Sequence, residues 1–527
     1  MRLGAGLPAE TPLNTAVAEI RRLMTTRTSA TMDTGSELLR TGVAGLDAIL
    51  MGGLAPRRLY LLEGEPGCGK TTLALQFLME GARNGEKVLY ITLSETAEEL
   101  NQVAASHGWS LQGVHIHEVI PGEEILSGEE TYTVFHPSEI ELNEAMRSFL
   151  NEIERLRPTR VVLDSLAELR LLAGSALRYR RHVLALKRFF SERRVTALVI
   201  DDRSSHEGDQ HVQSVAHGLI VMEQVERQHG TDRRRLRIAK YRATPYCGGY
   251  HDFIIGKGGL QVFQRLDPSD YRVPGPQRRI SSGLPELDEL FGGGLETGTS
   301  TLLSGAPGTG KSTLAAQFVD AAAGRGEKAA IFCFDEATPT LMVRAEALGM
   351  GLRRHVEAGT VSVAKIEPTE LSPGEFIQLV RDNVDRLDAS IVVIDSLNGY
   401  LQAMPDERFL VVQLHELLSF LASRGVVTIL VSTQSGLIGS NMSSVVDASY
   451  LADNVVLLRF FEAEGAVRQA ISVLKKRGGR HERTIREFSL EGGVRVGKPL
   501  KEFHGVLSGI PQYRGEAREL RERASAP

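Results

Sequence analysis

Short apolar runs alternate with helical patterns along most of this chain. Apolar runs of strand length predict buried parallel strands. In the first half these runs are 58–63, 87–93, 160–164 and 195–201, and in the second half they are 300–304, 328–334, 390–395 and 426–433. Apolar residues four positions apart, such as Leu73 with Phe77 and Leu314 with Phe318, predict an amphipathic helix after the first run of each half. The alternation predicts an α/β fold in which helices flank a mostly parallel sheet.

The two halves repeat one another. A constant offset of 241 positions relates three pairs of residues: Leu46 and Leu287, Lys70 and Lys311, and Glu95 and Glu336. An offset that holds over about fifty residues indicates a duplicated domain. We therefore divide the chain into an N-terminal extension (1–36), a first domain (37–265), a proline-rich linker (266–279), a second domain (280–505) and a C-terminal tail (506–527).

Each half carries the pattern GxxxxGK[ST] between its first strand and the following helix, at 64–71 and at 305–312. Such a loop wraps backbone N–H groups around nucleotide phosphates, and its lysine neutralises them. The candidate nucleotide-binding residues are Gly64, Gly67, Cys68, Gly69, Lys70, Thr71, Thr72, Gly305, Gly308, Thr309, Gly310, Lys311, Ser312 and Thr313. A glycine-rich turn without a ligand is the alternative, but two matches in the same context make it a poor explanation.

An aspartate ends the third predicted strand of each half, Asp164 and Asp395. A carboxylate at this place lies beside the phosphate loop and can hold a Mg²⁺-bound water, with Thr71 and Ser312 as further metal ligands. The alternative role is that of a helix N-cap after a strand. The pairing with an upstream phosphate loop in both halves favours the metal site.

Acidic residues follow the second strand, Glu95 in the first half and the pair Asp335 and Glu336 in the second. They are candidates for the general base that activates water, or for the acidic first turn of a helix. Ser94 stands where the second half has Asp335, so we expect hydrolysis to be weaker in the first half. Four cations on late strands, Lys240, Arg242, Lys475 and Arg477, could act on a neighbouring subunit's phosphates or protect a strand edge.

The composition excludes some functional classes. A net charge of −5 does not fit a dedicated nucleic-acid binder, and three cysteines without metal spacing fit a reducing compartment. No apolar run reaches transmembrane length, so a soluble cytoplasmic protein is expected. Together with the two phosphate loops, these properties make an ATPase the leading functional class.

The chain resembles the KaiC family of duplicated RecA-like ATPases. The resemblance rests on 41–47 and 282–288 at the start of the domains, on both phosphate loops, on the two Asp-Ser pairs, and on Lys475-Lys476-Arg477-Gly478 with His481. It implies a homohexamer of two stacked rings, with ATP and Mg²⁺ between subunits and with the four late cations acting in trans. It also implies autophosphorylation in the second domain. The family's acceptor pair aligns with Ser449 and Tyr450, so Ser449 is the expected acceptor and Ser444 a secondary one.

Three functions remain open at this stage. The first is a KaiC-like regulatory ATPase with serine autokinase activity and possible protein partners at its C-terminal tail. The second is a RecA- or DnaB-type motor, which would show DNA-stimulated hydrolysis. The third is a nucleotide-gated scaffold in which ATP only holds the ring together.

Overall fold

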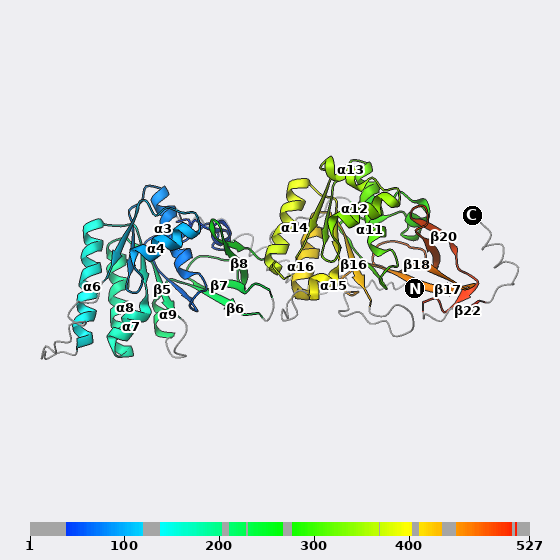
Figure 1. The fold of residues 1–527 in the computed structure, drawn as a ribbon. Helices are drawn as coiled ribbons and strands as arrows, with labels where there is room; N and C mark the ends of the chain where they lie inside the picture. Colours follow the sequence, from blue (N-terminus) through cyan, green and yellow to red (C-terminus); the bar gives the residue numbers. More distant parts are fainter. Residues whose placement is uncertain are drawn as a thin grey trace, which may run out of the picture.

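The computed structural model describes residues 38–119, 137–202, 210–227, 230–266, 277–367, 369–402, 410–434, 449–507 and 512–513. These residues form two lobes, each an α/β domain around a nine-stranded sheet (Figure 1). The expected fold, two tandem RecA-like P-loop domains with mostly parallel sheets flanked by helices, is confirmed. The predicted extension (1–36), most of the linker and most of the C-terminal tail lie outside the described residues.

The first sheet has the order β3-β2-β4-β5-β1-β6-β7-β8-β9. Its first six strands are parallel and its last three are antiparallel. The strands are β1 Leu59–Gly64, β2 Val88–Thr92, β3 Val114–Glu118, β4 Arg160–Asp164, β5 Thr196–Asp202, β6 Gly218–Val225, β7 Arg233–Tyr241, β8 His251–Gly256 and β9 Gly259–Phe263. All residues of β1, β2 and β4 are buried, which explains why these strands are almost continuously apolar.

Helices cover both faces of this sheet, so that the domain has three layers (Figure 1). One buried cluster lies on the side of α3 and contains Phe77, and another lies on the side of α6 to α8 and contains Phe149. The helices are α2 Ala44–Ile49, α3 Lys70–Arg83, α4 Ala97–Ser106, α6 Pro137–Leu156, α7 Leu166–Ala173, α8 Ala176–Glu192 and α9 Gln210–Val215.

The second sheet repeats the first strand for strand, in the order β14-β13-β15-β16-β12-β17-β18-β19-β20. Again six parallel strands are followed by three antiparallel ones. The strands are β12 Ser300–Gly305, β13 Ala329–Cys333, β14 Val361–Lys365, β15 Ile391–Asp395, β16 Val427–Thr433, β17 Asn454–Ala463, β18 Ala466–Lys476, β19 Arg486–Ser489 and β20 Arg495–Pro499. Two short pairs, β10 Arg279–Ile280 with β11 Leu295–Glu296 and β21 Phe503–His504 with β22 Gln512–Tyr513, lie outside it.

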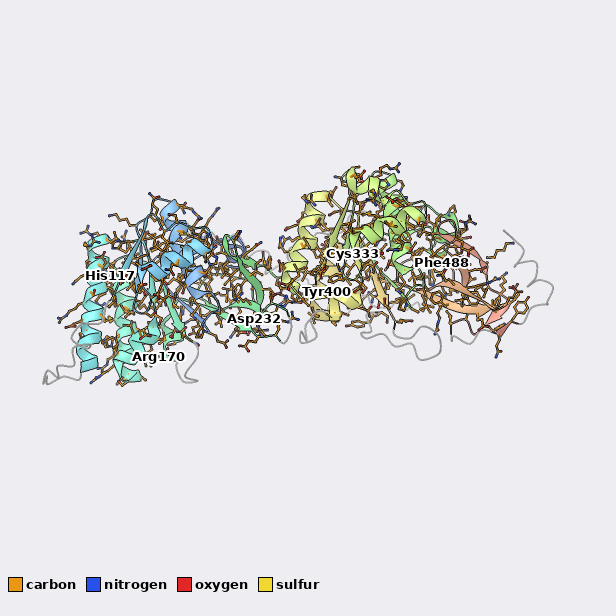
Figure 2. The ribbon with its side chains drawn as sticks, viewed as in Figure 1. His117, Arg170, Asp232, Cys333, Tyr400 and Phe488 are labelled. Atoms are coloured by element: carbon orange, nitrogen blue, oxygen red, sulfur yellow. The ribbon has the colours of Figure 1, made fainter. Side chains whose placement is uncertain are left out.

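The helices of the second domain are α10 Pro285–Leu290, α11 Lys311–Gly324, α12 Thr338–Ala347, α13 Leu352–Glu357, α14 Pro373–Leu387, α15 Leu397–Gln402 and α16 Leu410–Ser423. Its two core clusters lie on opposite faces of the sheet, one under α11 and one under α14 to α16. Phe334, directly after β13, packs edge-on against Phe376 of α14 and Tyr400 of α15, with ring centroids 5.3 and 6.0 Å apart. Tyr400 is labelled in Figure 2, in the lower part of the second lobe. These rings fix the loop that follows β13.

The eight strands expected from the apolar runs are all present, within one residue of the expected bounds at most ends. The 241-residue offset extends to secondary structure, because α3 and α11, and likewise α4 and α12, begin and end at corresponding positions. Residues that differ at this offset can therefore be compared directly.

The two lobes meet where β8 approaches α14 (Figure 1). Asp252 of β8 accepts a hydrogen bond from the backbone N–H of Gly374 in the first turn of α14, at 2.8 Å. Arg265 forms a forked ion pair with Glu416 of α16. A carboxylate at a helix N-terminus is favoured by the exposed N–H groups and by the helix dipole.

Candidate functional site

The phosphate loops of both domains have the same backbone. Gly69 and Gly310, which precede α3 and α11, have φ of 102° and 92°. A Cβ on Gly69 would lie 2.4 Å from Ile255, and one on Gly310 would lie 2.8 Å from Phe488. Only glycine fits these positions, because both the positive φ and the close packing exclude a side chain.

Cys68 and Thr309 occupy the same position of the two loops and are fully buried. The Thr309 hydroxyl donates to the carbonyl of Ala306 at 2.8 Å, and burial raises the pKa of the Cys68 thiol. Both side chains therefore fill the buried space inside the loop. Their backbone N–H groups, rather than their side chains, are what the loop can offer to a phosphate.

The two loop lysines differ in their partners. Each Nζ donates to two loop carbonyls: Lys70 to Gly64 and Glu65, and Lys311 to Gly305 and Ala306. Lys70 also forms an ion pair with Asp202, the last residue of β5, at 2.8 Å. In the second domain Thr433 stands at that place, since it pairs with Gly305 as Asp202 pairs with Gly64.

Lys311 is buried, and among the described residues no carboxylate lies within ion-pair distance of it. Burial lowers the pKa of Lys311 to about 8, although nearby Asp395 acts in the opposite direction. A buried cation without a paired anion is costly, and an anionic phosphate would relieve that cost.

Asp164 and Asp395 are the last residues of β4 and β15, as expected. Burial raises the pKa of both carboxyl groups. The Tyr90 hydroxyl donates to Asp164 at 2.5 Å and also interacts with Thr71, whereas Asp395 is hydrogen-bonded directly to Ser312. Carboxylate and hydroxyl oxygens beside a phosphate loop are the donors that suit Mg²⁺, so the residues present fit this ion.

Glu95 follows β2, and its backbone is fixed by Thr92, whose hydroxyl accepts from the Glu95 N–H and donates to its carbonyl. Burial, followed by the charges of Asp164 and Glu99, raises the pKa of Glu95 to about 7. Its Oε2 is buried and has no hydrogen-bond partner among the described residues. A half-buried carboxylate with an unoccupied acceptor oxygen and a pKa near neutrality has the properties of a general base.

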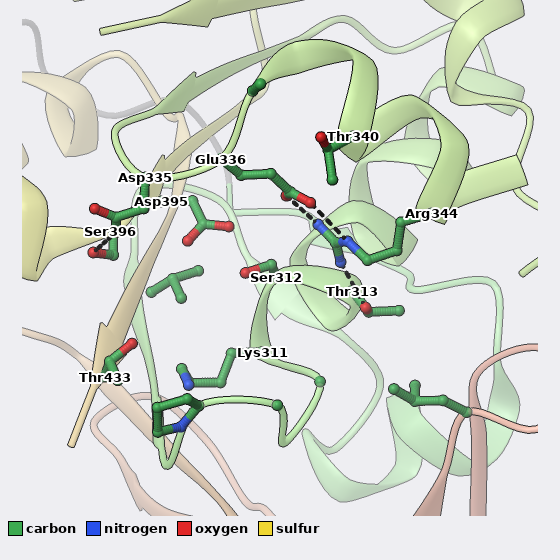
Figure 3. Close-up of a pocket in the computed structure, with 16 residues that line it drawn as sticks. Lys311, Ser312, Thr313, Asp335, Glu336, Thr340, Arg344, Asp395, Ser396 and Thr433 are labelled. Atoms are coloured by element: carbon green, nitrogen blue, oxygen red, sulfur yellow. Dashed lines mark hydrogen bonds and ion pairs between the residues drawn. The ribbon is translucent and has the colours of Figure 1, made fainter. Parts of the chain in front are cut away.

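Asp335 and Glu336 follow β13 and are both engaged (Figure 3). Asp335 accepts a 2.5 Å hydrogen bond from the Ser396 hydroxyl. Glu336 forms a forked ion pair with Arg344 of α12, with contacts of 3.2 and 2.6 Å. At this position the second domain has two acids and the first domain has one, but both acids of the second domain already have partners.

A cleft of about 570 Å³ joins these groups in the second domain (Figure 3). Its lining includes Lys311, Ser312, Asp335, Glu336, Arg344 and Asp395. The structure thus brings together the phosphate loop, the metal-site candidates and the acids that the sequence assigned to one site.

The four late cations lie elsewhere. Lys240 and Lys475 are within β7 and β18, but the strands end at the next residue, so Arg242 and Arg477 lie just beyond them rather than on them. Lys240 and Arg242 still point to the same side, because both donate to the carbonyl of Ser214. Neither Lys475 nor Arg477 lines the cleft of its own domain.

Ser449 lies half-buried shortly before β17, and its carbonyl accepts a hydrogen bond from Lys475 at 2.9 Å. The neighbouring Tyr450 is exposed. Ser444, the expected secondary acceptor, lies outside the described residues. Neither serine's role is tested by these positions.

Two site residues escaped the sequence reasoning. Asp202 ends a strand that neighbours the phosphate-loop strand, so the parallel order of strands could have placed it beside Lys70. Arg344 lies in α12, whose N-terminus begins two residues after Glu336, so a long side chain from this helix could have been expected to reach back to the acid. In both cases the signal was present but depended on the three-dimensional order of the elements.

A comparison with protein families agrees with this geometry. A family model described as "ATPase: KaiC" matches residues 39–267 and again residues 280–501. The chain belongs to the KaiC family of ATPases. It is similar to a Synechocystis protein named circadian clock protein KaiC3, with 29% identity over 502 residues that cover 92% of this chain and 96% of the relative. Proteins named circadian clock oscillator protein KaiC from Picosynechococcus and Thermosynechococcus vestitus are 26% and 27% identical, and they cover 90% and 89% of this chain.

The match to the family is nearly complete in length, since 93% and 91% of the two oscillator proteins are covered as well. Both repeats are matched, so each lobe is an ATPase domain of this family. Among the described residues no helix has the length and apolar character needed to cross a bilayer.

Proposed function

We propose that the protein is a KaiC-type regulatory ATPase that binds ATP with Mg²⁺ in both domains. The cleft of the second domain supports this function best, because it combines a phosphate loop, a strand-end aspartate and a loop lysine without a carboxylate partner among the described residues. The first domain has the same loop and aspartate. Phosphate binding is the common chemistry of these groups.

In each site the loop N–H groups and the lysine would hold the phosphates, and Thr71 with Asp164, or Ser312 with Asp395, would hold Mg²⁺. When bound, Mg²⁺ would neutralise negative charge on the phosphate oxygens. Glu95, or the acids Asp335 and Glu336, would accept a proton from the attacking water. The water oxygen would form a bond to the terminal phosphorus while the bond to ADP breaks, giving ADP and phosphate.

We further propose a homohexamer of two stacked rings, in which the late cations act on the nucleotide of the neighbouring subunit. Two observations support this part: Lys475 and Arg477 do not line the cleft of their own domain, and Lys240 with Arg242 converge at one edge of the first domain. Cations supplied in trans typically accelerate phosphoryl transfer by about 10³–10⁵.

The second domain is also the proposed autokinase, with Ser449 as the acceptor and Ser444 as a secondary one. Lys475, a proposed trans-acting cation, already contacts the backbone of Ser449. The acceptor would therefore lie beside the edge that faces the neighbouring subunit's site. Regulatory proteins would bind the C-terminal tail (506–527), and the cytoplasm is the proposed location.

Native mass measurement with and without ATP and Mg²⁺, combined with phosphate release and radiolabel mapping, tests the proposal. We expect an ATP-dependent hexamer, slow phosphate release and label on the peptide 444–450. Lys70→Ala and Lys311→Ala, compared side by side, would assign assembly and labelling to one site or the other. Phosphate release without label would contradict the proposed kinase activity and support the ATPase activity alone. Strong stimulation by DNA would instead favour a motor.

A further inference from the structure

Glu336 and its counterpart Glu95 differ in what holds their carboxylates. Glu95 Oε2 is buried without a hydrogen-bond partner among the described residues. Both oxygens of Glu336 accept hydrogen bonds from Arg344, Oε1 from Nε and Oε2 from Nη2. The equivalent glutamate therefore has an oxygen without a hydrogen-bond partner in the first domain, and both of its oxygens are hydrogen-bonded in the second.

Arg344 is held at a third point. Its Nη1 donates to the Thr313 hydroxyl at 2.7 Å, so the guanidinium bridges the acid and the first turn of α11 (Figure 3). Thr313 is itself buried and follows the Mg²⁺ candidate Ser312. A planar guanidinium with three fixed contacts loses little further entropy, which makes this pair more rigid than a single surface contact.

The first domain cannot make this contact. The position that corresponds to Arg344 is Val103, because α4 and α12 have matching bounds. Val103 is partly buried and packs against the core of its domain. The two helices have corresponding bounds but differ in most of their side chains, and at this position a valine cannot supply the guanidinium contact.

We propose that Arg344 is a positioning residue that holds Glu336 away from base catalysis, so that the second site keeps its nucleoside triphosphate while the first site hydrolyses it. This inference rests on the proposed ATPase function. A carboxylate whose two oxygens both accept hydrogen bonds from a guanidinium cannot take a proton from water until that ion pair is broken. The retained triphosphate would be available for transfer to a protein hydroxyl.

Hydrolysis by the second site alone tests this role. In the full chain with Glu95→Gln, we expect Arg344→Val to raise kcat by about three- to tenfold, with a much smaller change in KM. Arg344→Lys keeps the positive charge but loses the two-point contact with the carboxylate, and should raise kcat by about twofold. A thermal melt and the binding stoichiometry of a non-hydrolysable ATP analogue establish that each variant is folded.

Dependence on Glu336 separates this role from a merely structural one. Asp335, Asp395 and Lys311 also face the cleft and stay unchanged in these variants. Removal of the guanidinium should therefore raise kcat only while Glu336 is present, so Arg344→Val combined with Glu336→Gln should hydrolyse no faster than Glu336→Gln alone. A structural defect would change kcat by the same factor with and without Glu336.

The reciprocal variant uses the first domain. In the full chain with Asp335→Asn and Glu336→Gln, Val103→Arg should lower kcat by about three- to tenfold and move the acid limb to lower pH. An Arg344→Val chain that hydrolyses no faster than its parent, or that changes only in KM, would overturn the inference. If the Arg344→Val variant does not fold, Arg344→Lys decides in the same way.

The two proposals fail differently. Absence of phosphate release from the unmodified chain would refute the proposed ATPase function. The inference about Arg344 would then survive only if Arg344→Val created phosphate release that Glu336→Gln abolished.

Discussion

Among the described residues, the phosphate-loop lysine of the first domain forms an ion pair, and the acid after its second strand has an oxygen without a partner. In the second domain the lysine has no carboxylate partner, whereas both acids are engaged. Lys70 contacts Asp202 at 2.8 Å, but Thr433 stands at that place beside Lys311. Glu95 has an oxygen without a partner among the described residues, but Glu336 is held by Arg344. Two domains of one fold thus distribute the same charges in opposite ways.

This difference shows how a duplicated site can specialise without changing its loop. An open lysine favours phosphate binding, and an open acid favours removal of a proton from water. The first domain therefore has the arrangement of a hydrolytic site and the second that of a site which retains its nucleotide. The predictions below follow from these pairings, in order of decreasing expected effect.

Replacement of the loop lysines should have unequal effects. Lys311→Ala removes an unpaired charge, and a hydrogen bond from a charged group is worth about 1.5–3 kcal/mol, so ATP affinity at the second site should fall by about 10- to 100-fold. Lys70→Ala should cost several-fold less, because Asp202 already offsets its charge. Binding isotherms of a non-hydrolysable ATP analogue measure both, and equal losses would contradict the comparison.

The second site should also lose affinity in alkaline solution. Because burial lowers the pKa of Lys311 to about 8, its ammonium form is complete below that pH and is lost as the pH rises through it. ATP affinity at the second site should therefore fall by up to about tenfold per pH unit above 8. Titrations between pH 7 and 9.5 on the unmodified chain and on the Lys311→Ala chain give the contribution of Lys311 by difference, and the absence of any difference in pH dependence would show that Lys311 stays charged.

Exchange of the strand-end residues should give the smallest effect. Asp202→Thr copies the second domain and should raise ATP affinity at the first site by about two- to fivefold, since a partly exposed ion pair contributes up to about 1 kcal/mol. Thr433→Asp copies the first domain and should lower affinity at the second site by a similar factor. The pair is a matched control, because a general effect of negative charge on stability would appear in both melting curves. Changes in the same direction would exclude a local effect.

The fold was predictable because its signals are local and repeated. Fully buried strands such as β4 and β13 give nearly continuous apolar runs, and the constant offset from Lys70 to Lys311 revealed the duplication. The glycines of the loops were equally clear, since their positive φ and close packing allow no other residue.

The pairing of charges was not predictable in the same way. After its second strand the first half has one acid and the second half has two, and from this count we expected weaker hydrolysis in the first domain. The count does not reveal that Ser396 and Arg344 engage both acids of the second site. These partners come from other elements, β15 with its following turn and α12, so their contacts depend on the tertiary fold. The expectation of weaker hydrolysis stays untested, but the geometry argues for the reverse.

A direct comparison of hydrolysis by the two sites tests the central claim. One full-length chain carries Glu95→Gln, and the other carries Asp335→Asn with Glu336→Gln, so that each keeps a single set of acids. Phosphate release is measured at saturating ATP and Mg²⁺ at pH 8, where Glu95, with its pKa raised to about 7, is mostly ionised. We predict that the chain with Glu95 intact hydrolyses ATP at least about tenfold faster. Equal rates, or faster hydrolysis by the chain with Asp335 and Glu336 intact, would contradict the account.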